Sequence, residues 1–229
     1  MSIKIALIPA RGGSKRIPNK NLKIFNGKPL IVWTIEAAIE YGGFDSVIVS
    51  TDSEEIANVA VKEGAYVPFL RPAELSNDTA TTNDVIQHAV NWLEERGNKV
   101  EVISLLQPTS PLRDASDIHN AMSMLDMKNA DAIISVCETE HPIQHCNQLG
   151  EDLCMNNFLA EEALKRTQDL MPYYRLNGAI YIFRREFVGS LLSIYNSRSY
   201  AYIMNKYKSI DIDDEYDFLI AEFLKKQIK

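Results

Sequence analysis

The sequence predicts an α/β protein with a mostly parallel sheet that helices cover on both faces. Over the first two-thirds of its 229 residues, short apolar segments alternate with amphipathic segments of helical periodicity. Apolar residues make up 46% of the chain and charged residues 24%, as is ordinary for a globular protein with a substantial core. We expect one large domain, or one domain with a small appendage, over residues 1–229.

Five apolar segments have the length of buried strands: 3–9, 46–50, 65–70, 100–106 and 132–137. Helical patterns lie between them, at about 30–41, 54–62, 84–96 and 116–127. Ser53, followed by Glu54 and Glu55, predicts a capped helix start, because carboxylates are favoured near the N-terminal end of a helix.

The pattern changes between residues 138 and 175, where the sequence is polar, mixed and rich in His, Asn and Gln. We expect this segment to leave the core as a small β-arm that serves in dimer contact or covers a substrate. A strand at 177–183, a helix near 184–195, a strand near 200–204 and a final helix from about residue 214 then complete the chain.

The segment that follows the first strand is strongly cationic. Seven basic side chains precede the first acidic one, Glu36, although the formal net charge is −7. Four of them fall in Ala10-Arg-Gly-Gly-Ser-Lys-Arg-Ile-Pro-Asn-Lys-Asn21, where paired glycines let the backbone approach an anion closely. The segment lacks the spacing of a Walker A loop and of the dinucleotide fingerprint. We interpret it as a triphosphate site, with a solvated basic turn as the alternative.

Asp211 and Asp213 alternate with Ile210 and Ile212 late in the chain. On an extended backbone the two carboxylates point to one face, where they repel each other unless a cation lies between them. We expect this cation to be Mg²⁺, with Mn²⁺ as the alternative. The carboxylates that follow the pair are expected to cap the last helix.

Two further polar segments follow strand ends, Ser50-Thr-Asp52 and Gln107-Pro-Thr-Ser-Pro-Leu-Arg113. Because ligands of doubly wound sheets bind beyond the carboxyl ends of the strands, one crevice could collect them with the cationic segment. The prolines fix the second segment, and Gln107 is its best candidate for a ligand contact. Arg166 and Arg175 suit bidentate recognition of an acidic substrate.

Composition excludes several other classes of partner. The acidic balance and the absence of a long basic stripe argue against nucleic acid, and no apolar run reaches membrane-spanning length. The three cysteines have neither disulfide-framework nor zinc-site spacing, so we expect free thiols and a cytoplasmic location.

Taken together, these motifs resemble the acylneuraminate cytidylyltransferases, also called CMP-sialic acid synthetases. The matching pieces are Ile8-Pro-Ala-Arg-Gly-Gly-Ser-Lys15 with Lys20-Asn21, Val49-Ser-Thr-Asp52, Arg71-Pro-Ala-Glu-Leu75 with Asp78-Thr79, Leu106-Gln-Pro-Thr-Ser-Pro-Leu-Arg113, Arg175-Leu-Asn-Gly-Ala-Ile-Tyr181 and Ser209-Ile-Asp-Ile-Asp213. They occur in the family's order and span almost the whole chain.

The resemblance implies a Rossmann-like nucleotidyltransferase fold of three layers, a homodimer and dependence on Mg²⁺. It also implies transfer of CMP from CTP to the anomeric 2-hydroxyl of a nonulosonic acid, with release of pyrophosphate. We expect a sialic acid as the acceptor, with legionaminic or pseudaminic acid as the alternatives.

The resemblance also implies roles for individual residues. The nucleotide would be held by Arg11, Ser14, Lys15, Lys20, Asn21, Arg71, Thr82 and Gln107. The sugar acid would be faced by Gln107, Arg166, Gln168, Asn177 and Tyr181, and the metal by Asp211 and Asp213. Catalysis would fall to Arg11, Lys15, Lys20, Arg166 and Asp211.

The sequence departs from the family at one position of the excursion. Relatives donate a lysine across the dimer to the sugar carboxylate, whereas this chain has Ile143-Gln-His145, so either Gln144 or His145 would take its place. The general base is left open. A D-x-D glycosyltransferase and a non-catalytic nucleotide-binding subunit are the alternatives from other classes.

Overall fold

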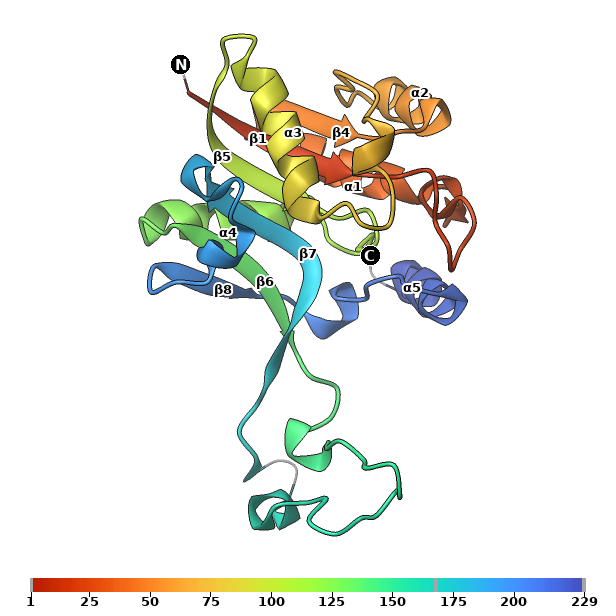
Figure 1. Cartoon of the computed structure of the whole chain (residues 1–229), viewed down its shortest axis with the longest axis vertical. Coiled ribbons are helices and arrows are strands. Elements are labelled where there is room, and N and C mark those ends of the chain that lie inside the picture. Colours follow the sequence, from red (N-terminus) through yellow and green to blue (C-terminus); the bar gives the residue numbers. More distant parts are fainter. Residues whose placement is uncertain (1, 167–168, 228–229) are drawn as a thin grey trace.

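The computed structural model describes residues 2–166 and 169–227 and shows a layered α/β body from which one long arm projects (Figure 1). The strands of the main sheet are β1 (Ser2–Pro9), β4 (Ser46–Ser50), β5 (Lys99–Leu106), β6 (Ala132–Glu138), β7 (Tyr174–Arg184) and β8 (Ser199–Ile203). They lie in the order β4-β1-β5-β7-β6-β8. β7 runs antiparallel to β5 and β6, whereas the other neighbouring pairs are parallel, so the expected mostly parallel sheet is confirmed.

Helices cover both faces of this sheet (Figure 1). One face packs against α1 (Leu30–Tyr41), α2 (Glu54–Lys62) and α4 (Ala115–Met127), and the other against α3 (Thr82–Glu94). Successive side chains of β1 point to opposite faces of the sheet. Ala6 and Ile8 therefore enter the first core, while Ile5 and Leu7 enter the second. Ser53 caps α2 as expected, with its side chain accepting a hydrogen bond from the Ile56 N–H.

The last helix, α5 (Glu215–Gln227), packs on a short hairpin formed by β2 (Ile24–Phe25) and β3 (Lys28–Pro29). Phe218 lies edge-on to Phe25, with ring centroids 5.5 Å apart. Ile212 and Ile17 belong to the same small core. This packing brings the segment that contains Asp211 and Asp213 alongside the cationic segment that follows β1.

Two expected elements are wrong. Residues 65–70 form only isolated bridges, Ile48 to Tyr66 and Thr51 to Leu70, because Pro68 has no N–H to donate to a strand ladder. The expected helix near 184–195 is two 3₁₀ turns, Arg185–Phe187 and Leu191–Ile194. Gly189 separates them in a left-handed conformation, φ +93°, that a helix cannot contain.

The expected excursion projects as an arm below the body (Figure 1), but it is not a β-arm. The β6–β7 pairing ends where Glu138 meets Tyr174. Beyond that point the described residues contain the 3₁₀ turns Ile143–His145 and Glu161–Leu164 and no strand. Among the described helices, none has both the length and the apolar character needed to cross a membrane.

A charged cluster fastens the late chain to α4. Asp114 caps this helix by accepting hydrogen bonds from the Ser116 and Asp117 N–H groups. Lys208, which directly precedes the Ser209–Asp213 motif, donates to both Asp114 and Asp117. Burial opposes ionisation of Asp114, but the hydrogen bonds from Lys208, Ser116 and Asp117 outweigh it and lower the pKa of Asp114 to about 2.

We expect Asp114→Asn to lower the free energy of unfolding at neutral pH by about 0.5–1 kcal/mol, since asparagine still caps the helix but cannot pair with Lys208. The lowered pKa makes Asp114 stabilising above the ordinary carboxylate range, about pH 4, and this contribution is lost as the pH falls through about 2. Urea unfolding across this range should show the difference between wild type and variant shrinking with acidification. A difference that does not change with pH would contradict the ion-pair explanation.

Candidate active site

The cationic segment leaves β1 at the carboxyl edge of the sheet and is fixed by its neighbours. The Gly12 N–H donates to Asp52 Oδ1 at 2.9 Å, which joins the segment to the end of β4. A Cβ at Gly12 would lie 3.1 Å from Ser53 Cβ, so glycine allows this close approach. Asn21 Nδ2 donates to the Arg11 carbonyl at 3.0 Å and closes the segment on itself.

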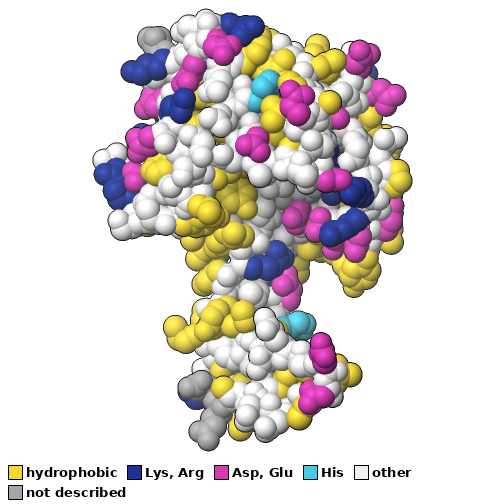
Figure 2. Space-filling model, in the orientation of Figure 1, with side chains coloured by type: hydrophobic (Ala, Val, Ile, Leu, Met, Phe, Trp, Pro, Cys, Tyr) yellow, Lys and Arg dark blue, Asp and Glu magenta, His cyan; other side chains and the backbone are white. Residues whose placement is uncertain are grey.

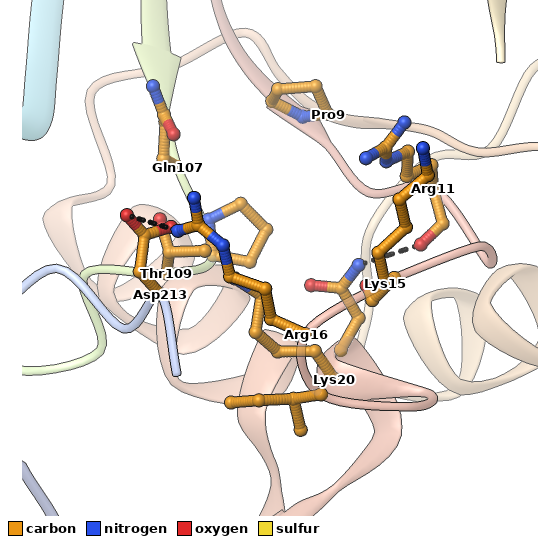
Figure 3. Close-up of a pocket in the computed structure, with 12 residues that line it drawn as sticks. Pro9, Arg11, Lys15, Arg16, Lys20, Gln107, Thr109 and Asp213 are labelled. Atoms are coloured by element: carbon orange, nitrogen blue, oxygen red, sulfur yellow. Dashed lines mark hydrogen bonds and ion pairs between the residues drawn. The ribbon is translucent and has the colours of Figure 1, made fainter. Parts of the chain in front are cut away.

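A cavity of about 460 Å³ opens beside this segment (Figure 3). It is lined by Pro9, Arg11, Ser14, Lys15, Arg16, Ile17, Lys20, Asn21, Gln107, Pro108, Thr109 and Asp213. The structure therefore brings together seven of the predicted site residues: Arg11, Ser14, Lys15, Lys20, Asn21, Gln107 and Asp213. The cavity lies where β1 and β5 diverge to opposite neighbours, the place where doubly wound sheets bind ligands.

A second cavity of about 340 Å³ adjoins the first and shares Pro9 and Arg11 with it. It holds the two remaining predicted nucleotide residues, Arg71 and Thr82. Arg71 is buried, and its Nε donates to Ser76 Oγ at 3.1 Å. Burial lowers the pKa of Arg71, while the Asp52 carboxylate, 3.8 Å from Nη2, opposes this shift.

Asp213 and Asp211 differ sharply in their surroundings. Asp213 is exposed and forms an ion pair with Arg16 at 3.1 Å (Figure 3). Asp211 is half-buried, and its Oδ1 has no hydrogen-bond partner among the described residues. Burial raises the pKa of Asp211, the Thr109 side chain opposes this shift, and the charge of Asp213 adds to it. A buried carboxylate oxygen without a partner, beside a second carboxylate, fits the oxygen ligands that a hard divalent cation prefers.

Two neighbours adjust the position of these carboxylates. Lys20 Nζ donates to the Ile212 carbonyl at 2.6 Å, between the two aspartates. Burial lowers the pKa of Lys20, and the charges of Asp213 and Asp211 oppose this shift. At Gly178, φ is +73° and a Cβ would lie 3.3 Å from Asp211 Oδ2, so glycine is required by both conformation and space.

Of the predicted sugar residues that the structure describes, Gln107 lines the cavity, whereas Asn177, Tyr181 and Arg166 do not. Asn177 is 1% exposed, and its amide binds Ser135 and Ser209. Tyr181 lies half-buried on β7 between Leu105 and Ile134 of the neighbouring strands. Arg166 lies on the arm, where it pairs with Asp169 at 3.3 Å. Gln168 lies outside the described residues.

The structure also places the two residues that stand where relatives have a lysine. His145 uses its Nε2 in a 3.1 Å hydrogen bond with the Ala163 carbonyl, which joins the two 3₁₀ turns of the arm. Gln144 keeps a buried Oε1 without a hydrogen-bond partner among the described residues.

Sequence reasoning missed the buried role of Arg113. Its guanidinium is 1% exposed, and Nη1 donates to the carbonyls of Gln107, at 3.3 Å, and Ala179, at 2.9 Å. Burial lowers the pKa of Arg113 to about 10, against the charges of Asp117 and Asp114. Arg113 thus ties the end of β5 to β7, and the only sequence signal was a basic residue after two prolines.

The sequence profile described as cytidylyltransferase matches residues 5–228. The chain belongs to the cytidylyltransferase family. Among its relatives, the N-acylneuraminate cytidylyltransferase of Streptococcus agalactiae serotype V is 39% identical over 218 residues, which are 94% of this chain and 51% of that protein. This chain therefore spans about half the length of that relative.

Another relative matches along nearly its whole length. The pseudaminic acid cytidylyltransferase of Campylobacter jejuni serotype O:2 is 35% identical over 222 residues, which are 97% of this chain and 96% of that protein. A solved CMP:2-keto-3-deoxy-manno-octonic acid synthetase complexed with CTP superimposes with a TM-score of 0.70 over 99% of both chains. At 18% identity this likeness shows the fold alone.

We expect Asn177→Ala to destabilise the protein, because it leaves the buried Ser135 and Ser209 hydroxyls short of a partner. The free energy of unfolding should fall by roughly 2–4 kcal/mol, which urea unfolding measures. The control is Asn91→Ala on the exposed face of α3, expected to change it by less than about 0.5 kcal/mol. Full stability of Asn177→Ala would contradict the structural role inferred from its hydrogen bonds.

Proposed function

We propose that this cytidylyltransferase transfers CMP from CTP to the anomeric 2-hydroxyl of an N-acylneuraminic acid, giving CMP-sialic acid and pyrophosphate. The same reaction on legionaminic or pseudaminic acid is the alternative. The streptococcal relative supports the first acceptor, and the Campylobacter relative supports the alternative. We also propose a cytoplasmic location, which free thiols such as those of Cys137, Cys146 and Cys154 favour.

The observation that carries this proposal is the juxtaposition of four cations with a carboxylate at one cavity. Arg11, Lys15, Arg16 and Lys20 line it together with Asp213, and Asp211 lies two residues from Asp213. Displacement of pyrophosphate builds negative charge on the departing phosphates, and preorganised cations stabilise that charge. Because nucleotidyl transfer is largely positioning and electrostatics, this arrangement supports the proposed chemistry.

The residues that line the two cavities would bind different parts of the nucleotide. Arg11, Lys15 and Arg16 bind the phosphates that depart as pyrophosphate. Gln107, at the end of β5 and held through its carbonyl by Arg113, orients the ligand on the opposite wall. The adjoining cavity with Arg71 receives the base and ribose.

Asp211 and Asp213 would hold Mg²⁺. When bound, this ion would stabilise negative charge on the phosphate oxygens and orient them. Asp213 must leave Arg16 to do so, which would free that guanidinium for a phosphate. Binding of the ion would then strengthen binding of the nucleotide, and binding of the nucleotide would strengthen binding of the ion.

The sugar acid would be bound with help from a second copy of the chain. Arg166 lies on the arm and does not line the cavity of its own chain. The arm exposes apolar side chains on its surface (Figure 2), and among them Leu153 (69% exposed) and Met155 (60%) are large side chains that a partner would cover. We therefore propose a homodimer in which the arm contacts the partner.

We expect pyrophosphate release from CTP and Mg²⁺ with one member of a panel of N-acetylneuraminic, legionaminic, pseudaminic and ketodeoxyoctulosonic acids. Asp211→Asn should lower kcat/KM by about 100-fold or more, because metal coordination contributes several kcal/mol. The control is Asp214→Asn, which can still cap α5 through the Tyr216 and Asp217 N–H groups. Tight CTP binding without release with any sugar acid would overturn the proposal.

We expect the wild-type chain to sediment as a dimer and Met155→Asp to shift the distribution toward monomer. A charge on an apolar surface that becomes buried between copies carries a desolvation cost. Met127→Asp is the control, because Met127 is 80% exposed at the end of α4, away from the arm. A monomeric wild type would rule out the proposed dimer.

A further inference from the structure

Asp78 is an acidic residue among the predicted phosphate-binding cations. Its Oδ2 lies 2.6 Å from Lys15 Nζ, and its Oδ1 lies 3.1 Å from Arg11 Nη1. One carboxylate thus bridges the two side chains, with one oxygen on each, as two oxygens of a phosphate group would. Figure 3 shows Lys15 and Arg11 close together on one side of the cavity.

The segment that carries Asp78 is anchored on both sides of it. Before Asp78, Ser76 binds the Arg71 side chain and the Pro72 carbonyl. After it, the Thr79 and Ala80 N–H groups both donate to Asn77 Oδ1 at 2.9 Å, and Thr81 caps the N-terminus of α3 in a capping box. The Asp78 side chain is 55% exposed, and its carboxylate is bound by Arg11 and Lys15 alone among the described residues.

We propose that Asp78 competes with the terminal phosphates of the nucleotide for Arg11 and Lys15. This inference rests on the proposed function, because it takes both cations to be phosphate ligands. A phosphate that binds them must displace the carboxylate. The measured association constant is therefore the intrinsic constant multiplied by the fraction of molecules in which Asp78 is free of both cations. The release of Asp78 requires movement of its side chain and leaves both anchors of the segment intact.

Competition of this kind affects substrate and product alike. Asp78 weakens binding of CTP and also of the pyrophosphate that remains after transfer, since both need Arg11 and Lys15. Return of the carboxylate to its two partners favours departure of pyrophosphate. A ligand without β- and γ-phosphates, such as CMP, does not need to displace Asp78.

The test is calorimetric titration of the full chain with inorganic tripolyphosphate, inorganic pyrophosphate and CMP. Asp78→Asn keeps the shape of the side chain and removes its charge. Because exposed ion pairs are each worth about 0.2–1 kcal/mol, we expect tripolyphosphate and pyrophosphate to bind roughly 3- to 10-fold more tightly. CMP affinity should not change. The control is Asp126→Asn, which removes a carboxylate of α4 that pairs at 3.6 Å with Lys4, near the start of β1. This variant should leave all three affinities unchanged.

Either weaker binding or an unselective gain in affinity in Asp78→Asn would overturn the inference. Weaker binding of tripolyphosphate by Asp78→Asn would mean that the carboxylate orients the cations for the ligand. Equal tightening for all three ligands, CMP included, would mean that removing any nearby negative charge suffices.

Lys15→Ala separates failure of this inference from failure of the proposed function. If this variant binds tripolyphosphate as tightly as wild type, the phosphate site itself is misassigned and the inference falls with it. If Lys15→Ala weakens binding and Asp78→Asn has no effect, the phosphate site stands and the competition alone is refuted.

Discussion

Repulsion among the cations that follow β1 is the constraint on which the organisation of this site depends. Arg11, Lys15, Arg16 and Lys20 line a single cavity. Like charges gathered in one place destabilise a folded chain unless acceptors lie nearby. The acceptors come from other segments: Asp78 for Arg11 and Lys15, Asp213 for Arg16, and the Ile212 carbonyl for Lys20. The cationic segment therefore has its conformation only within the assembled fold.

The same acceptors connect stability with chemistry. Asp213 pairs with Arg16 and is also a proposed metal ligand, so on that proposal this ion pair would open when the nucleotide and metal bind. Asp78 has the corresponding relation to Arg11 and Lys15. On the proposed function, ligand contacts would replace these ion pairs when the nucleotide binds.

Behind the cavity, two buried polar residues hold the strand ends in register. Arg113 binds the carbonyls of Gln107 and Ala179, and Asn177 joins Ser135 to Ser209. A buried charge or amide is costly unless its hydrogen-bonding groups find partners, and among the described residues Arg113 finds them for Nη1 but not for Nε or Nη2. The bonds that these two residues make tie the positions of β5, β7 and the Ser209–Asp213 motif to one another. The proposed binding site for the sugar acid is different, since its predicted residue Arg166 lies on the arm. On the proposed function, another chain would be needed to complete that site.

The sequence by itself determined the strand–helix alternation, the strand that leads into a cationic segment, and Gln107 at a strand end, because apolar periodicity and local charge are written in consecutive residues. It misjudged 65–70 and 184–195, where Pro68 and Gly189 override apolar composition, and it described as a β-arm a segment that contains 3₁₀ turns. Only the tertiary structure decided that Asp78 reaches Arg11 and Lys15, that Arg113 is buried, and that Asn177 is committed to hydrogen bonds inside the body. Each of these depends on contacts between residues tens of positions apart, and side-chain burial and pairing follow from such contacts and not from local pattern.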